Sequence, residues 1–171
     1  MSQKKSKIPK INKKSAGSEQ LRRFRILVAN GVNLDLLGQR DPEHYGLDGL
    51  GEIEQKLNEF AVQLHGLWPH MVFDLSFFQS NDERVFLEHF DQGWDGVLLN
   101  AGAWTHTSLA LADRLAALRL PFVEVHLSNL ARREDFRHKS YTAAQSLGVV
   151  YGFGTDSYLT GLVGLLLQLQ K

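Results

Sequence analysis

The sequence contains no cysteine, no long apolar run and none of the common cofactor-binding motifs. Without cysteine there is no disulfide, no thiolate metal ligand and no cysteine nucleophile, and the chain suits a reducing compartment. The histidines lack metal-ligand spacing, and the only phosphate-loop candidate, Gly152-Phe-Gly154, comes without a GxGxxG motif or a Walker lysine. No segment approaches the length of a membrane span. We therefore expect a cytoplasmic protein that needs no metal ion or organic cofactor and binds no membrane.

The charges are divided unevenly along the chain, although the formal net charge is zero. Residues 1–23 contain eight Lys or Arg and one Glu, whereas residues 24–171 contain eleven Lys or Arg and eighteen Asp or Glu. We interpret residues 1–23 as a basic, flexible extension and residues 24–171 as one domain, because 171 residues is an ordinary single-domain length. The extension could contact nucleic acid, but a solvated arm beside an acidic body explains it as well, so we expect no nucleic-acid partner.

Apolar runs and helical patterns alternate along the domain. The runs predict strands at 25–29, 71–77, 96–99, 121–127 and 148–151. Apolar stripes predict four helices: around 53–64, from a Ser80 or Asn81 cap to Phe90, from Thr107-Ser108 to Leu118, and over 157–169. Several strands are apolar on both faces, which is typical of a parallel sheet covered on both sides. The pattern predicts a single-domain α/β fold with a doubly wound, five-stranded parallel sheet.

Polar side chains follow three of the five predicted strands. Asn33, Arg40 and Tyr45 come after the first strand, residues 100–106 after the third, and residues 124–129 at the end of the fourth. In parallel sheets the working crevice lies beyond the carboxyl ends of the strands. We therefore expect these three groups to meet at one edge of the sheet.

Arg40 and Tyr45 form a candidate activated phenol. Ionising a free tyrosine near neutral pH costs about 4 kcal/mol, because its ordinary pKa is about 10. One guanidinium about 4 Å away in a half-buried site supplies on the order of that energy. The pair could therefore act as a base.

Glu124 and His126 form a candidate acid–base pair. They alternate with Ser128, so the three share one face if the strand stays extended. A carboxylate two residues before a histidine can fix its tautomer and make it a proton donor near pH 7. The alternative is an ordinary buried histidine at a strand end, which the neighbouring polar strand ends make less favoured.

Other polar residues have both a functional and a structural interpretation. Asn100 and His106 could bind a polyhydroxylated ligand, or they could cap local backbone and begin the next helix. The arginines at 132, 133 and 137 could bind an anion or acids of a neighbouring subunit, or form a solvated helix face. Asp113 lies two turns after His106 on the same predicted helix and could be an exposed helical carboxylate.

Five segments occur in an order typical of one family: NGVNLDLLGQRDPEHYG, FFQSNDE, LLNAGAWTHTSLALAD, VEVHLSN with REDFRHKSY, and GFGTDSYLTGL. From about residue 25 to the C-terminus the chain resembles the type II 3-dehydroquinate dehydratases, or type II dehydroquinases. The resemblance implies a flavodoxin-like catalytic domain at 24–171. It implies an anti elimination of water from 3-dehydroquinate to 3-dehydroshikimate through an enol or enolate, without metal or organic cofactor. It also implies a homododecamer of trimers.

The resemblance further implies a role for each site residue. Tyr45 is the base that removes the C2 proton, Arg40 lowers the pKa of Tyr45, and Asn33 helps to hold the enolate through a water. His126 protonates the departing C1 hydroxyl, and Glu124 orients His126. The resemblance assigns the remaining residues to substrate binding. The substrate's hydroxyls are held by Asn100, His106 and Arg137, and its carboxylate is held by Leu127 and Ser128. Arg133 lies on the mobile-loop side, and Asp113 reaches an adjacent subunit's site.

Two positions depart from the family pattern near the proposed site. Val32 stands where the family has the proline of NGPN, and this replacement removes a residue that pre-sets the loop. Ala112 stands where the family has an arginine before Asp113, which removes a partner for pairing between subunits. A flavodoxin-like ligand-binding module or an inactive pseudoenzyme is the alternative function. Shikimate synthesis and quinate breakdown both use the implied reaction, so the sequence leaves the pathway open.

Overall fold

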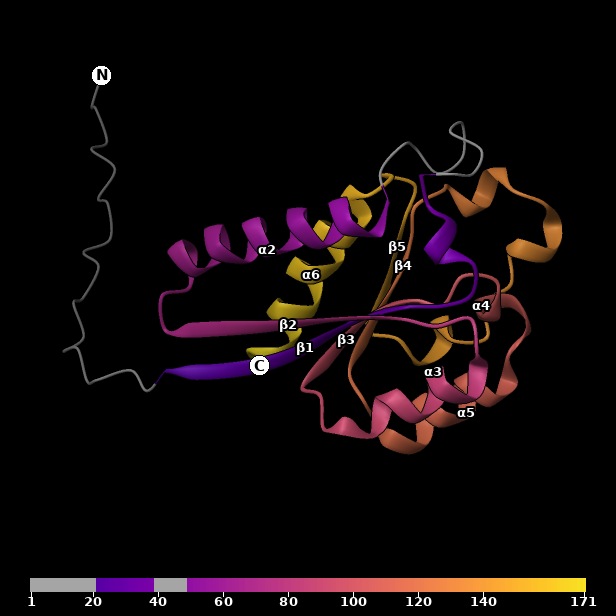
Figure 1. Ribbon diagram of the computed structural model, residues 1–171. Helices are drawn as coiled ribbons and strands as arrows, with labels where there is room; N and C mark the ends of the chain where they lie inside the picture. Colours follow the sequence, from indigo (N-terminus) through magenta and orange to yellow (C-terminus); the bar gives the residue numbers. More distant parts are fainter. Residues whose placement is uncertain (1–20, 39–48) are drawn as a thin grey trace, which may run out of the picture.

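Five parallel strands form one sheet in the computed structural model, which describes residues 21–38 and 49–171 (Figure 1). The strands are β1 (Arg22–Asn30), β2 (Met71–Gln79), β3 (Gly96–Asn100), β4 (Phe122–His126) and β5 (Gly148–Tyr151). Their spatial order is β2-β1-β3-β4-β5, and all four pairings are parallel. The predicted flavodoxin-like, doubly wound sheet is confirmed. This order creates a topological switch point between β1 and β3, the place where such folds bind ligands.

The first strand is longer than the sequence predicted. It begins at Arg22 and therefore includes Arg22 and Arg23, which the charge pattern placed in the basic extension. Both residues pair in register with the start of β2. The guanidinium of Arg23 also lies 2.8 Å from the carboxylate of Asp74 on β2. Cross-strand pairing with β2 thus extends the strand beyond its apolar segment.

Helices cover both faces of the sheet. Helices α2 (Leu50–Leu67) and α6 (Asp156–Leu169) lie on one face, and α3 (Glu83–His89) and α5 (Leu109–Leu118) lie on the other (Figure 1). The connections contain the short helix α4 (Trp104–Thr107) and the 3-10 turns η1 (Leu34–Leu36), η2 (Phe90–Gln92), η3 (Leu130–Arg132), η4 (Asp135–Arg137) and η5 (Ala143–Gln145). Within the two described ranges, no helix combines the length and the apolar character needed to cross a membrane.

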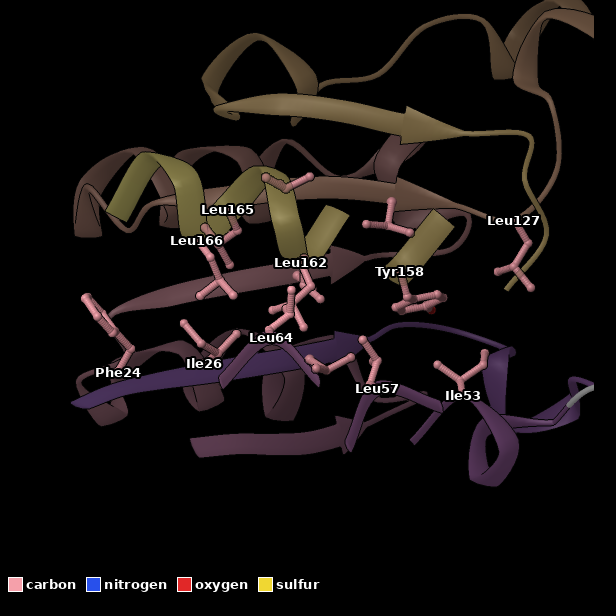
Figure 2. Packing of buried hydrophobic residues seen from close by; sticks show 14 of the residues in the cluster. Phe24, Ile26, Ile53, Leu57, Leu64, Leu127, Tyr158, Leu162, Leu165 and Leu166 are labelled. Carbon is pink, nitrogen blue, oxygen red and sulfur yellow. The ribbon is translucent and has the colours of Figure 1, made fainter. Parts of the chain in front are cut away.

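Alternate residues of β1 enter two separate apolar clusters. Ile26 and Val28 pack with residues of α2 and α6, whereas Leu27 and Ala29 pack with residues of α3 and α5. All four are fully buried, which explains why the strand reads as a continuous apolar run. The α6 side of the first cluster includes Leu162, Leu165 and Leu166 (Figure 2). Burying each such leucine stabilises the fold by about 1.5–3 kcal/mol.

The start of α3 differs from the prediction. The sequence pointed to Ser80 or Asn81 as the N-cap, but the cap is Asp82, whose carboxylate accepts a hydrogen bond from the backbone N–H of Val85 at 3.1 Å. The Ser80 hydroxyl instead binds the backbone of Asp82. The Asn81 side chain turns away to the loop after β1. Both predicted caps were wrong because their side chains have other partners.

The prediction that His106 and Asp113 share one helix was also wrong. His106 lies in α4 and Asp113 in α5, because the backbone at Ser108 is extended (φ −97°, ψ 105°). The Ser108 hydroxyl caps α5 by accepting a hydrogen bond from the backbone N–H of Leu111 at 2.9 Å. This cap begins a new helix, so the two side chains do not follow a single helical spacing.

Candidate active site

The carboxyl ends of β1, β3 and β4 surround a cavity of about 130 Å³ at the topological switch point of the sheet. Arg40 and Tyr45 lie outside the residues that the structure describes. Eight of the predicted site residues line the cavity: Asn33, Asn100, His106, His126, Leu127, Ser128, Arg133 and Arg137. The fold therefore brings together polar groups that are separated by about a hundred residues of sequence.

Glu124 and His126 form a buried pair at the end of β4. Nε2 of His126 lies 2.8 Å from Oε1 of Glu124, and the Glu124 side chain is fully buried. Val125 between them points into the cluster under α6, as strand alternation requires. Because Nε2 is engaged by the carboxylate, Nδ1 is the ring nitrogen that remains for a ligand in the cavity.

The second oxygen of Glu124 also has partners. Oε2 accepts hydrogen bonds from the hydroxyls of Thr142 at 2.5 Å and Ser140 at 2.9 Å. Burial raises the pKa of Glu124, but the hydrogen bond and charge of His126 and the two hydroxyl bonds outweigh burial, and the net pKa lies below its ordinary value. Glu124 is thus a carboxylate at neutral pH, and it can hold a proton on Nε2 of His126.

His106 faces His126 across the cavity. The two rings are nearly parallel, with centroids 6.2 Å apart. Nδ1 of His106 lies 2.8 Å from the backbone oxygen of Lys139, to which it can only donate. Burial lowers the pKa of His106, with further lowering by the charges of His126 and Arg137. The neutral ring then carries its proton on Nδ1 and offers Nε2 to a ligand as an acceptor, which suits a hydroxyl group.

Asn100, at the end of β3, has a fixed side-chain orientation. Its Oδ1 accepts a hydrogen bond from the backbone N–H of Gly102 at 3.2 Å, and its Nδ2 donates to the hydroxyl of Tyr158 at 2.9 Å. That hydroxyl donates in turn to Oδ1 of Asn30 at 2.6 Å. Burial raises the pKa of Tyr158, so the phenol stays protonated. The amide of Asn100 therefore keeps one N–H for the cavity.

Two arginines contribute positive charge to the cavity wall. Nη1 of Arg133 donates to the hydroxyl of Ser128 at 3.1 Å, which joins η3 to the end of β4. Nε of Arg133 and Nε of Arg137 lie 3.2 Å and 3.0 Å from Oε2 of Glu134. Arg132 is exposed, so only two members of the predicted basic cluster face the cavity. The solvated-face interpretation therefore holds for Arg132 alone.

The loop after β1 and the loop after β3 pack directly against each other through their backbones. A Cβ at Gly31 would lie 2.3 Å from the backbone oxygen of Ala101, so any side chain there would clash. Gly102 has a φ of +61°, and its Cβ would lie 2.6 Å from the backbone oxygen of Val32. Asn33 adopts the left-handed conformation with φ 64°. Two glycines and one asparagine thus supply the geometry of this wall.

The sequence analysis missed three residues of this region, and one residue that it assigned to the site, Asp113, lies outside the cavity. Asp113 is exposed on α5 and is not part of the cavity wall formed by the described residues. Thr142, Ser140 and Tyr158 were not predicted as site residues. The motifs REDFRHKSY and GFGTDSYLTGL contain Ser140 and Tyr158, so motif membership was the available signal. Among residues 21–38 and 49–171, no cluster of three or more His, Asp or Glu side chains could hold a metal ion.

Comparison with known proteins agrees with this architecture. The sequence model described as dehydroquinase class II matches residues 24–166. The chain belongs to the class II dehydroquinase family. It is 50% identical over 148 residues to the 3-dehydroquinate dehydratase of Nostoc sp., and the aligned region covers 85% of this chain and 96% of the relative. It is 44% identical over 144 residues to that of Syntrophotalea carbinolica, covering 81% of this chain and 92% of the relative.

Solved structures of the family have the same fold. The type II dehydroquinase from Butyrivibrio crossotus superimposes with a TM-score of 0.75 at 32% identity, covering 87% of this chain and 99% of that one. The type II dehydroquinase from Propionibacterium acnes gives a TM-score of 0.73 at 32% identity, covering 88% and 99%. The predicted family and fold are therefore confirmed.

Proposed function

We propose that the chain is a hydro-lyase that removes water from 3-dehydroquinate and forms 3-dehydroshikimate by anti elimination through an enol or enolate. Family membership and relatives named 3-dehydroquinate dehydratase support the reaction. The observation that carries the mechanism is the Glu124–His126 pair, because it places a buried, ionised carboxylate behind a histidine that lines the cavity. Such a pair can deliver a proton to a leaving hydroxyl.

The proposed reaction requires a base and an acid on opposite sides of the substrate. Tyr45, activated by Arg40, removes the C2 proton, and Asn33 helps to hold the resulting enolate through a water. The ring of His126, protonated on both nitrogens and stabilised by Glu124, then donates its Nδ1 proton to the C1 hydroxyl, which leaves as water, and the ring becomes neutral. Pre-placed donors toward the enolate are each worth a few kcal/mol. The C2 proton passes to the base, the acid supplies one proton to the C1 hydroxyl, and the net change is the loss of one water molecule.

The remaining polar groups bind the substrate in this proposal. The N–H of Asn100 and the acceptor Nε2 of His106 meet hydroxyl groups, and Arg137 adds a donor. The backbone and hydroxyl of Ser128, with the backbone of Leu127, hold the carboxylate. Arg133 supports that end of the cavity because it already donates to the Ser128 hydroxyl. A small polyhydroxylated acid fits this distribution of donors and positive charge.

We further propose that residues 24–171 form the catalytic domain and that residues 1–23 are a basic extension outside it. The exposed position of Asp113 on α5 is compatible with its reaching a neighbouring subunit's site in a homododecamer of trimers. We place the enzyme in the cytoplasm and its reaction in the shikimate pathway, where it serves aromatic amino acid synthesis. Quinate catabolism uses the same step.

A direct assay tests the proposed activity. Purified full-length chain mixed with 3-dehydroquinate should produce the enone absorbance of 3-dehydroshikimate, without added metal or cofactor. A surface variant, Arg84→Ala, serves as the matched positive control, since Arg84 pairs only with exposed Glu88 on α3 in the described contacts. Absence of turnover with tight binding of a shikimate-like acid would instead indicate a binding module or an inactive relative.

A further inference from the structure

The side chain of Asn81 connects the end of β2 to the loop after β1. Its Oδ1 accepts hydrogen bonds from the backbone N–H of Asn33 at 2.7 Å and from Nε2 of Gln79 at 3.1 Å. Its Nδ2 donates to Oδ2 of Asp35 at 3.0 Å. One amide thus makes three hydrogen bonds to three residues. Two of those residues, Asn33 and Asp35, lie in the loop that forms one wall of the cavity.

The residues before and after Asn81 in the sequence, Ser80 and Asp82, are both fixed by hydrogen bonds. The backbone N–H of Ser80 donates to the backbone oxygen of Asn30 at 3.2 Å, which continues the pairing of β1 with β2. The Ser80 hydroxyl accepts from the backbone N–H of Asp82 at 3.0 Å. Asp82 then caps α3. Asn81 therefore lies in a hydrogen-bonded turn between a sheet strand and a capped helix, and it can hold the loop after β1 in place.

The residue that Asn81 fixes by a hydrogen bond is Asn33. Its φ of 64° lies in the left-handed region, which is strained for most residues and less so for asparagine. Val32 before it cannot restrict the loop as a proline would. A hydrogen bond from the Asn33 backbone to Asn81 compensates for part of that freedom. Gln79 contributes a second contact, 3.3 Å from its Nε2 to the backbone oxygen of Gly31.

We propose that Asn81 is a positioning residue, which fixes Asn33 in the conformation that lines the cavity and so supports stabilisation of the enolate. This inference rests on the proposed function for the role of Asn33. Asn81 does not line the cavity formed by the described residues, so its effect on the reaction passes through Asn33.

The first test compares Asn81→Ala with Asp82→Ala in the full-length chain. Asp82→Ala removes the cap of α3 and should lower the melting temperature by about 2–4 °C while kcat stays within twofold of wild type. Asn81→Ala should lower kcat about 10- to 100-fold, because small misplacements near a reacting group have effects of that order. The KM for 3-dehydroquinate should change by less than kcat does. Equal effects of the two variants on kcat would overturn the proposal.

A second test exchanges the partners of one hydrogen bond. Asn81→Asp places a carboxylate against Asp35 and should lower kcat about tenfold or more by disturbing the loop. Adding Asp35→Asn restores the hydrogen bond in the reverse direction, with the amide at position 35 as donor and the carboxylate at position 81 as acceptor. The kcat of the double variant should therefore return to within fivefold of wild type. Asp35→Asn alone keeps an acceptor and should have near-normal kcat. Failure of the double variant to recover would overturn the proposal.

Amide hydrogen exchange at Asn33 separates this inference from the proposed function. The Asn33 backbone N–H should exchange at least tenfold faster in Asn81→Ala than in wild type, while exchange in β3 stays unchanged. If wild type did not turn over 3-dehydroquinate, the proposed function would fail, yet this measurement would still report whether Asn81 holds Asn33. Unchanged exchange at Asn33 in the variant would overturn the inference whatever the activity.

Discussion

Replacing His126 with alanine should lower kcat about 10²–10⁴-fold, the usual effect of removing a positioned general acid. The reason is the geometry at the end of β4, where Glu124 holds the ring through Nε2 and leaves Nδ1 toward the cavity. Without the imidazole, the C1 hydroxyl has no proton donor when it leaves. Exchange of the C2 proton with deuterated solvent should nevertheless continue, because the base is untouched. Product formation and C2 exchange are measured on the same sample.

The alanine variant also leaves a buried carboxylate without its main partner, which reduces stability. His126→Gln is the matched companion, since its amide can still donate to Glu124 but cannot act as an acid. Both variants should lose turnover, and the glutamine variant should retain more thermal stability. If C2 exchange ceased together with turnover in the stable glutamine variant, His126 would not be only the acid.

Replacing Tyr45 with phenylalanine should lower kcat by a similar factor, about 10²–10⁴-fold, through loss of the base. Here C2 exchange should disappear with turnover, in contrast to the His126 variants. Binding of a shikimate-like acid, measured by calorimetry, should remain within a few-fold of wild type because the ring is kept. Ionising a phenol near neutral pH costs about 4 kcal/mol, and in the proposed mechanism Arg40 supplies the charge that offsets this cost.

Near-normal kcat in Tyr45→Phe would remove Tyr45 as the base. Arg40→Lys provides a separate control on activation, since lysine keeps the charge but not the fixed guanidinium geometry. That variant should shift the pH dependence of kcat/KM to higher pH, because a less well-stabilised phenolate forms at higher pH. The two substitutions together distinguish the base from the group that activates it.

Local patterns in the sequence predicted most of the fold. The apolar run of β1 predicted a strand buried on both faces, and Ile26 and Leu27 do enter opposite clusters. The spatial order of the strands was not predictable from these patterns, because it depends on which edge each crossover reaches. The start of α5 at Ser108 agrees with the prediction, but the separate helix α4 was missed because four residues are too few to show a helical period, so His106 was assigned to the helix of Asp113.

The site was predictable where its residues stand directly at strand ends. Asn100 and His126 line the cavity as their positions indicated. The supporting residues were missed because their contacts are distant in sequence. Tyr158 reaches Asn30 from the last helix, and Asn81 reaches back to the loop after β1. No spacing rule connects such residues, since their proximity arises only when the sheet has formed.

The stereochemistry of hydrogen loss at C2 reports on which side of the substrate each catalytic group acts. In the proposed mechanism a base and the Glu124–His126 pair act from opposite sides of 3-dehydroquinate. Substrate carrying deuterium at only one of the two C2 positions is converted by the full-length chain, and the label in the 3-dehydroshikimate is measured by mass spectrometry. We expect loss of the C2 hydrogen that is anti to the C1 hydroxyl. Loss of the syn hydrogen would contradict the proposed mechanism.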